Sequence, residues 1–190
     1  MDILVNNAGK IQLHYAWELV DRTTSLRAGI AAFDKVQNAS TADVSAIRDC
    51  IEVNLIGLVQ TTTTFLPLLR ASEQAVILNV STEMASNSLQ AGPNARTHVV
   101  AYNTSKAAVN SYTIALAQEL KKEGIKVNAV TPGFTSTKLN YFHHGGKTTR
   151  QGAEALLPWA LIDKDRPTCE YCRYRYILRY SPDLCRSVFG

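Results

Sequence analysis

The amino-acid sequence predicts an α/β domain built on a parallel β-sheet. Short apolar runs typical of buried strands alternate with longer helical patterns. We expect strands at 2–6, 75–80 and 125–130, and helices near 43–71 and 102–122. Strands separated by helices of this length favour parallel pairing with right-handed crossovers. At 190 residues, of which 46% are hydrophobic, the chain is long enough for one domain with a core.

The first predicted strand, at 2–6, runs into the turn-forming sequence Asn-Asn-Ala-Gly at 6–9. The segment at 10–46 is long, and part of it has weak periodicity. It is interpreted either as an insertion or as retained non-coding sequence. The helix near 43–71 carries Asn54. The apolar strand at 75–80 ends in Ser81 and Thr82. Residues 86–94, which are rich in turn formers, are expected to form an enlarged loop.

The helix at 102–122 has an apolar stripe that predicts packing on the sheet or on a partner subunit. The stripe consists of Val109, Tyr112, Ala115, Leu116, Ala117 and Leu120. The strand at 125–130 ends where Pro132 and Gly133 follow it, since proline ends a strand and glycine permits a turn.

The most informative pattern is the pair Tyr102 and Lys106 at the start of this helix. A spacing of four residues puts both side chains on one helix face. A nearby cation favours the phenolate, so we expect the pKa of Tyr102 to fall from about 10 toward the range of proton exchange at neutral pH. The pair therefore indicates general acid/base chemistry on a carbonyl or an alcohol.

These segments, in this order, resemble the short-chain dehydrogenase/reductase family. The resemblance rests on residues 6–9, Asn54, the strand ending at Ser81 and Thr82, the Tyr102–Lys106 pair, and residues 127–133 with Thr137. It covers roughly residues 1–165. It implies a doubly wound parallel sheet of the Rossmann type.

The resemblance implies a role for each catalytic position. Tyr102 matches the family's acid/base, and Lys106 matches the lysine that lowers its pKa and holds the nicotinamide ribose. Asn54 matches the asparagine of a water-mediated proton relay. The family's catalytic serine corresponds first to Thr82 and second to Ser81. A threonine hydroxyl donates as a serine does, although its methyl group narrows the site.

The resemblance also implies NAD or NADP as cofactor, bound by Tyr102, Lys106 and residues at two strand ends. These residues are Asn6, Asn7, Ala8 and Gly9 after the first strand, and Pro132, Gly133, Phe134 and Thr137 after the third. The alternative is that both segments are only turns at strand ends. The presence of Tyr102, Lys106 and Asn54 in the same sequence favours the cofactor interpretation.

Part of the family's pattern is not found in this sequence. The ten glycines include no Gly-x-x-x-Gly-x-Gly turn, which in the family binds the cofactor pyrophosphate. The first three strands of the family's sheet also have no counterpart. We therefore expect residues 1–165 to form an incomplete domain, truncated at its N-terminal side, in which the strand at 2–6 becomes an exposed apolar edge.

Residues 166–190 differ in composition and are interpreted as a poorly ordered tail foreign to the family. Cys169 and Cys172 could form half a zinc site or a redox pair, and the alternating Arg and Tyr residues at 173–176 could attract nucleic acid. Neither has a supporting second feature, so we expect no metal site and no nucleic-acid partner. The loop at 135–150 occupies the place of the family's substrate-covering loop. Its residues His143 and His144 either bind substrate or metal, or have no role.

The expected function is hydride transfer between a nicotinamide and a small carbonyl or secondary alcohol, in a homo-oligomer. The net charge of +4 is modest and implies no acidic partner. No 18-residue apolar run and no signal-peptide pattern is present, so we expect no membrane partner and a cytoplasmic location. The alternative is a non-catalytic remnant that serves as a dimerisation or interaction partner. The substrate, the choice between NAD and NADP, the direction of reaction and the oligomeric state are left open.

Overall fold

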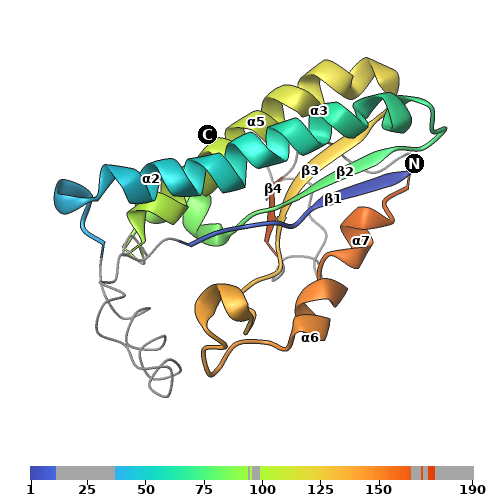
Figure 1. Cartoon of the computed structure of the whole chain (residues 1–190). Helices are drawn as coiled ribbons and strands as arrows, with labels where there is room; N and C mark the ends of the chain where they lie inside the picture. The colour runs from blue at the N-terminus through green and yellow to red at the C-terminus, as the bar shows by residue number, and fades with distance from the viewer. Residues whose placement is uncertain (12–36, 94, 96–98, 164–167, 169–170, 174–190) are drawn as a thin grey trace.

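The computed structural model in Figure 1 describes residues 1–11, 37–93, 95, 99–163, 168 and 171–173. Its strands are β1 (Ile3–Asn6), β2 (Val76–Val80), β3 (Lys126–Thr131) and β4 (Tyr171–Arg173). Its α-helices are α2 (Val44–Ile51), α3 (Gly57–Arg70), α4 (Asn87–Gln90), α5 (Val100–Leu120), α6 (Thr149–Glu154) and α7 (Leu157–Ala160). The three predicted strands and both predicted helices are confirmed, with small shifts at their ends.

The four strands form one parallel sheet in the order β1-β2-β3-β4. Asn6 lies opposite Asn79, and Val80 lies opposite Val130, so the carboxyl ends of β1, β2 and β3 meet at one edge. The short strand β4 falls within the segment interpreted as a tail. The other residues of 166–190 except Thr168, like residues 12–36 of the proposed insertion, lie outside the described residues, and both interpretations stay predictions.

Residues 44–70 form one helical run that contains a single π-helical turn, Glu52–Ile56. Asp43 caps the run, because its side chain accepts a hydrogen bond from the Ser45 backbone N–H at 2.7 Å. In the π-turn the Gly57 N–H donates to the Glu52 carbonyl five residues back. A single π-turn inside an α-helix is often found at a functional site, and this one contains Asn54.

Helices α3 and α5 cover one face of the sheet (Figure 1), and the main core lies between them and the strands. Its buried members are Leu69, Ala75, Ile77, Leu116, Ala117, Leu120, Ile125 and Val127. The apolar stripe of α5 therefore packs on the sheet, apart from Ala115, which is exposed. Burying a large aliphatic side chain contributes about 1.5–3 kcal/mol, so this cluster is the main stabilising layer.

The opposite face of the sheet carries α6 and α7 (Figure 1). Ala160 and Trp159 of α7, with Leu156, pack against Leu78 and Val130 of the central strands. No helix among the described residues is both long and apolar enough to cross a lipid bilayer.

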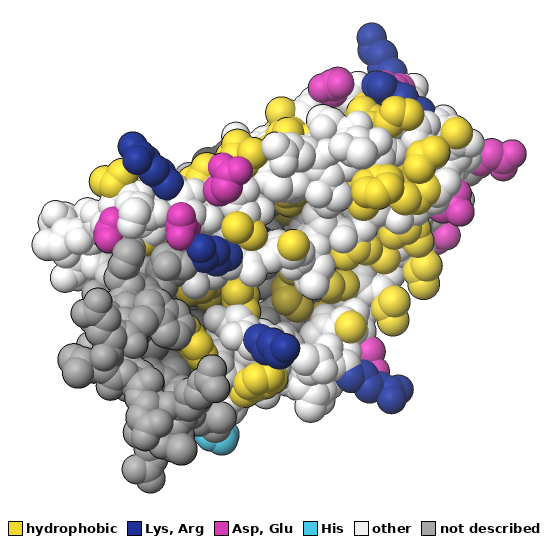
Figure 2. Space-filling model, viewed as in Figure 1, with side chains coloured by type: hydrophobic (Ala, Val, Ile, Leu, Met, Phe, Trp, Pro, Cys, Tyr) yellow, Lys and Arg dark blue, Asp and Glu magenta, His cyan; other side chains and the backbone are white. Residues whose placement is uncertain are grey.

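Strand β1 is the edge of the sheet in the described part of the chain, as predicted. Ile3 and Val5 are 37% and 41% exposed. Figure 2 shows apolar side chains gathered on the side of the molecule where β1 and α7 lie. This strand therefore presents the apolar edge that the sequence indicated.

The segment after β2 differs from the predicted loop, because it contains a 3-10 turn, Glu83–Ala85, and the helix α4. Thr82 accepts a hydrogen bond from the Met84 N–H, and Ser86 accepts one from the Leu89 N–H. Ser86, which lies in the predicted loop, acts here as a helix cap, and so does Thr82 before it. The enlarged loop predicted over 86–94 therefore contains a short helix at 87–90.

Candidate functional site

The carboxyl ends of β1, β2 and β3 bring the predicted site segments together. Residues 7–9 follow β1, Ser81 and Thr82 follow β2, and Pro132 and Gly133 follow β3. The Ser81 N–H donates to the Val130 carbonyl at 2.8 Å, which joins two of these ends directly. In open parallel sheets this edge is where ligands bind.

Lys106 places a buried ammonium at this edge. The residue is 3% exposed, and its Nζ donates to the Val80 carbonyl at 2.9 Å. A Cβ atom added to Gly9 would lie 3.7 Å from Lys106 Nζ and 3.7 Å from Asn54 Oδ1. Gly9, Asn54 and Lys106 therefore lie side by side. Burial lowers the pKa of Lys106 to about 8, because the charged form has lost its hydration.

Tyr102 lies on the same helix and is 8% exposed. It forms a small cluster with Val99, and Ile11 and Met84 pack against this cluster. Burial raises the pKa of Tyr102 well above its ordinary value, and the nearby Cys50 thiol raises it further.

The expectation that Lys106 lowers the pKa of Tyr102 was wrong for this structure. The Lys106 ammonium donates to Val80, and the loss of water around the phenol outweighs any attraction from that charge. Tyr102 is therefore the neutral phenol at neutral pH.

The Asn54 side chain connects three segments of the site and is fully buried. Its Oδ1 accepts from the Lys10 N–H at 2.7 Å, and its Nδ2 donates to the Lys10 carbonyl at 2.9 Å. Nδ2 also donates to Ser105 Oγ at 2.8 Å, and Ser105 in turn donates to the Tyr102 carbonyl at 2.8 Å. Asn54 thus ties the chain after β1 to the helical turn that carries Tyr102.

Ser105 and Lys10 are residues of this network that the sequence analysis missed. Ser105 lies inside the Tyr102–Lys106 pattern, and its position before Lys106 was the one available signal. Lys10 takes part mainly through its backbone, which no side-chain pattern reveals. Its side chain forms an ion pair with Asp49 at 2.8 Å on the surface.

The two candidate hydroxyls after β2 differ in what surrounds them. Ser81 is 4% exposed and donates to Asn110 Oδ1 at 2.7 Å. Thr82 is half-buried, accepts from the Met84 N–H at 3.3 Å, and donates its own hydroxyl hydrogen to no group among the described residues. Thr82 therefore has a donor available, whereas the donor of Ser81 is already engaged.

The other predicted cofactor residues of β1 divide into two kinds. The Asn6 side chain is buried and donates to Thr62 Oγ1 at 2.9 Å and to Asn79 Oδ1 at 2.8 Å. Its side chain therefore links β1 to β2 and α3. Asn7 and Ala8 are exposed at that end.

After β3, Gly133 adopts a positive φ of 73°, a conformation that glycine takes at little cost. Pro132 is half-buried, and Phe134 is 43% exposed. Thr137 caps a 3-10 turn, Lys138–Asn140, by accepting from the Leu139 N–H. Lys147 donates to the Pro132 carbonyl, and its ammonium occupies the place of a side chain at Gly133.

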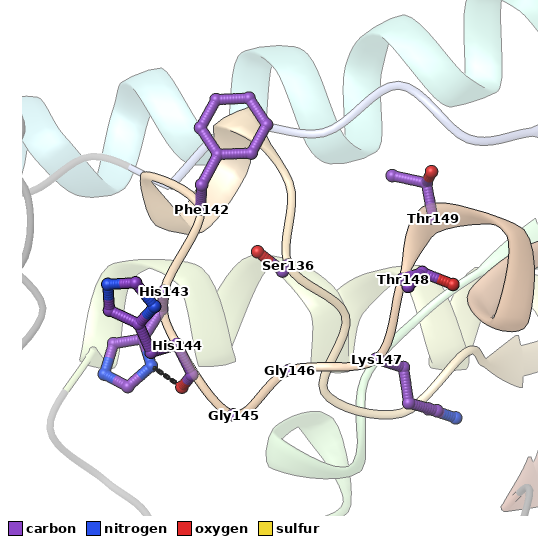
Figure 3. Close-up of a pocket in the computed structure, with 9 residues that line it drawn as sticks. All are labelled: Ser136, Phe142, His143, His144, Gly145, Gly146, Lys147, Thr148 and Thr149. Atoms are coloured by element: carbon purple, nitrogen blue, oxygen red, sulfur yellow. Dashed lines mark hydrogen bonds between the residues drawn. The ribbon is translucent and has the colours of Figure 1, made fainter.

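The loop that continues from Gly133 lines a hollow of about 420 Å³ that is open to the surface (Figure 3). Its polar lining consists of Ser136, His143, His144, Lys147, Thr148 and Thr149. Within the described residues, no group of three or more His, Cys, Asp or Glu side chains has the arrangement of a metal site.

Comparison with known proteins places this arrangement in a family. A family sequence model described as short chain dehydrogenase matches residues 1–144. The (+)-neomenthol dehydrogenase of Capsicum annuum is 26% identical over an alignment 216 positions long, which covers 88% of this chain and 68% of that protein. Estradiol 17-beta-dehydrogenase 2 of Rattus norvegicus is 33% identical over 138 residues, which cover 73% of this chain and 32% of that protein.

Solved structures show the same fold. The structure of salutaridine reductase from Papaver somniferum superposes with a TM-score of 0.67 at 24% identity, over 90% of this chain and 72% of that one. The family match spans more than half of the sequence, and the fold agrees with it. This chain therefore belongs to the short chain dehydrogenase family.

Proposed function

We propose that this protein is an oxidoreductase that transfers a hydride between NAD or NADP and a carbonyl or secondary alcohol of a small molecule. The observation that carries the proposal is the buried Lys106 ammonium at the strand ends. The Val80 carbonyl is its one hydrogen-bond acceptor among the described residues. An ammonium has three donors, and burying a charge with two of them unpaired is costly. Ribose hydroxyls of a nicotinamide cofactor would supply the remaining acceptors.

The residues at this edge fit the nicotinamide end of such a cofactor. Gly9 has no side chain to cover Lys106, and Tyr102 lies one helical turn away from it. When bound, the nicotinamide supplies or accepts the hydride. The chain around Gly133 and Thr137 would contact the cofactor's phosphates. Either NAD or NADP is compatible with these residues.

Tyr102 would act as the proton donor to a carbonyl oxygen. Because burial raises its pKa, the phenol holds its proton at neutral pH, which is the form that reduction requires. Lys106 would hold the cofactor ribose beside it. Asn54 would support the proton relay by fixing both the chain at Lys10 and, through Ser105, the turn of Tyr102.

Thr82 would hold the substrate oxygen through its available hydroxyl hydrogen, in preference to Ser81. The Ser81–Asn110 hydrogen bond instead fixes the start of this segment, which Asn110 also contacts at the Ala85 carbonyl. The names of the relatives refer to neomenthol, salutaridine and estradiol, which differ widely. We therefore propose only the class of substrate, a carbonyl or secondary alcohol. The cytoplasmic location stays a prediction.

Replacing Tyr102 by Phe removes the proton donor and keeps the ring that packs with Val99. We expect turnover of a carbonyl substrate with NADPH or NADH to fall about 10²–10⁴-fold, since this is the usual contribution of a general acid. Circular dichroism should stay that of the unchanged protein, and the cofactor should still bind through Lys106. Undiminished turnover in a folded variant would exclude Tyr102 as the acid.

The two hydroxyls can be separated by matched substitutions. Thr82→Val keeps the shape and removes the donor, so kcat should fall strongly, and the loss of the cap at the Met84 N–H should cost about 0.5–2 kcal/mol of stability. Ser81→Ala leaves Asn110 Oδ1 unpaired in a buried place, so the free energy of unfolding should fall by about 1–3 kcal/mol while kcat changes less. Steady-state kinetics and urea unfolding measure both quantities, and the reverse pattern would assign the role to Ser81.

Lys106→Met tests the cost of the buried ammonium. One pKa unit corresponds to about 1.4 kcal/mol, so lowering the pKa from 10.5 to about 8 costs the fold roughly 3 kcal/mol below pH 8. Between pH 8 and 10.5 the unfolded chain binds the proton more tightly than the fold, so the cost disappears as pH rises. The stability of the variant relative to the unchanged protein should therefore fall by roughly 3 kcal/mol from pH 7 to pH 10.5.

Urea unfolding at these two pH values measures that difference. Lys121→Met, which removes an exposed positive charge just beyond the end of the same helix, controls for the loss of one charge. A relative stability of Lys106→Met that does not change with pH would contradict the buried ammonium.

We further propose a homo-oligomer assembled through the outer face of the helical run 44–70. Val53, Ile56, Phe65 and Leu68 are 38%, 37%, 38% and 53% exposed there. Light scattering should give a dimer or tetramer for the unchanged protein and a smaller species for Leu68→Glu. A monomer at all concentrations would refute the assembly.

A further inference from the structure

The hollow beyond β3 is lined on its polar side by hydrogen-bond donors and by no carboxylate. Six polar side chains line it, from Ser136 to Thr149, and no Asp or Glu is among the lining residues. Lys147 adds a positive charge that the Pro132 carbonyl holds in place. A concave surface with this composition favours an anion over a cation or a neutral group.

Three of these side chains have polar groups to offer a ligand. The Ser136 hydroxyl, the His144 imidazole and the Thr149 hydroxyl make no hydrogen bond with any described residue. Figure 3 shows the two imidazoles on one side of the hollow and the two threonines on the other, with Gly145 and Gly146 between them. The Thr148 hydroxyl is bonded to Gln151, so a small anion at the centre would lie between the His144 imidazole and the Thr149 hydroxyl.

The hollow is held open by contacts within the loop. The Ser136 N–H donates to the Lys147 carbonyl at 2.9 Å, and the Lys147 N–H donates to the Phe134 carbonyl at 3.0 Å. A Cβ atom on Gly146 would lie 2.7 Å from Ser136 N, so the two arms of the loop approach this closely because residue 146 is glycine. The donors are therefore positioned before any ligand arrives, which reduces the cost of binding.

Phe142 adds an apolar wall beside the polar lining. It has a φ of 55° and follows Tyr141 at 53°, and such values are unusual for bulky residues. Phe142 is nevertheless 54% exposed, and it borders the hollow (Figure 3). Strained backbone that presents an exposed aromatic ring is typical of a ligand site.

We propose that this hollow binds an anionic group, a carboxylate or a phosphate, of the small molecule on which the enzyme acts, with the apolar part of that molecule against Phe142. The identification of that molecule as the substrate rests on the proposed function. The hollow opens from the loop that follows Gly133, so a ligand held there lies on the same side of the sheet edge as the candidate site.

The test uses sodium acetate and inorganic phosphate as probes, followed by ¹H–¹⁵N NMR of the full chain. We expect saturable shifts at the Gly145 and Gly146 amides, with a Kd of roughly a millimolar. His144→Gln should weaken binding, and His144→Gln with Lys147→Gln should weaken it about tenfold or more. Lys138→Gln removes a positive charge from the same loop outside the hollow and should leave binding unchanged.

Three results would overturn the proposal. The first is that neither probe produces saturable shifts. The second is that Lys138→Gln weakens binding as much as the double variant, which would mean non-specific attraction. The third is that saturating NADPH displaces the probes, which would assign the hollow to the cofactor's own phosphates. If the probes and NADPH bind at the same time, the hollow is separate from the cofactor site, as the proposal expects.

The probe titration needs neither activity nor cofactor. If NADPH does not bind, the proposed function fails, while the response to acetate and phosphate still decides whether the hollow binds anions.

Discussion

The hydrogen bonds of the Asn54 side chain are the constraint on which the site depends. Through them the chain after β1, the helical run 44–70 and the first turn of α5 take fixed positions relative to one another. The π-turn places the amide where all three bonds can form. Both of its polar atoms are engaged in a fully buried place, so loss of the amide would leave Lys10 and Ser105 with unpaired groups. Asn54 therefore helps to position Gly9 and Lys106, which lie next to its partners in the sequence, and Tyr102, whose carbonyl accepts from Ser105.

The site combines a buried positive charge with a buried neutral phenol, and each is costly in a different way. The Lys106 ammonium loses its hydration on burial and gains only one hydrogen-bond acceptor among the described residues. Its burial therefore lowers the free energy of unfolding. Tyr102 keeps its proton because its surroundings disfavour the phenolate. Groups held at such a cost at the ends of parallel strands are more typical of binding and catalysis than of stability. The proposed function explains both groups by one ligand, a nicotinamide cofactor whose ribose pairs with Lys106 beside the proton donor Tyr102.

Much of this arrangement could be predicted from the sequence, because strands and helices depend on local patterns. The meeting of Gly9, Asn54 and Lys106 follows from a family resemblance carried by fixed spacings. The pKa of Tyr102 could not be predicted, since it depends on Ile11, Met84 and Val99 from three separate segments. The difference between Ser81 and Thr82 depends on Asn110, a helix residue with no motif of its own. The helix α4 was missed because its caps also resemble turn residues.

The central claim is that the strand ends around Lys106 bind a nicotinamide cofactor. Titration of the purified chain with NADPH and with NADH, followed by cofactor fluorescence and by Tm, tests it most directly. The account predicts saturable micromolar binding of at least one cofactor and a rise in Tm with its concentration. Binding should be much weaker in Lys106→Met, and the loss in Tyr102→Phe should be smaller. A folded sample that binds neither cofactor, or a Lys106→Met variant that binds as tightly as the unchanged protein, would contradict the account.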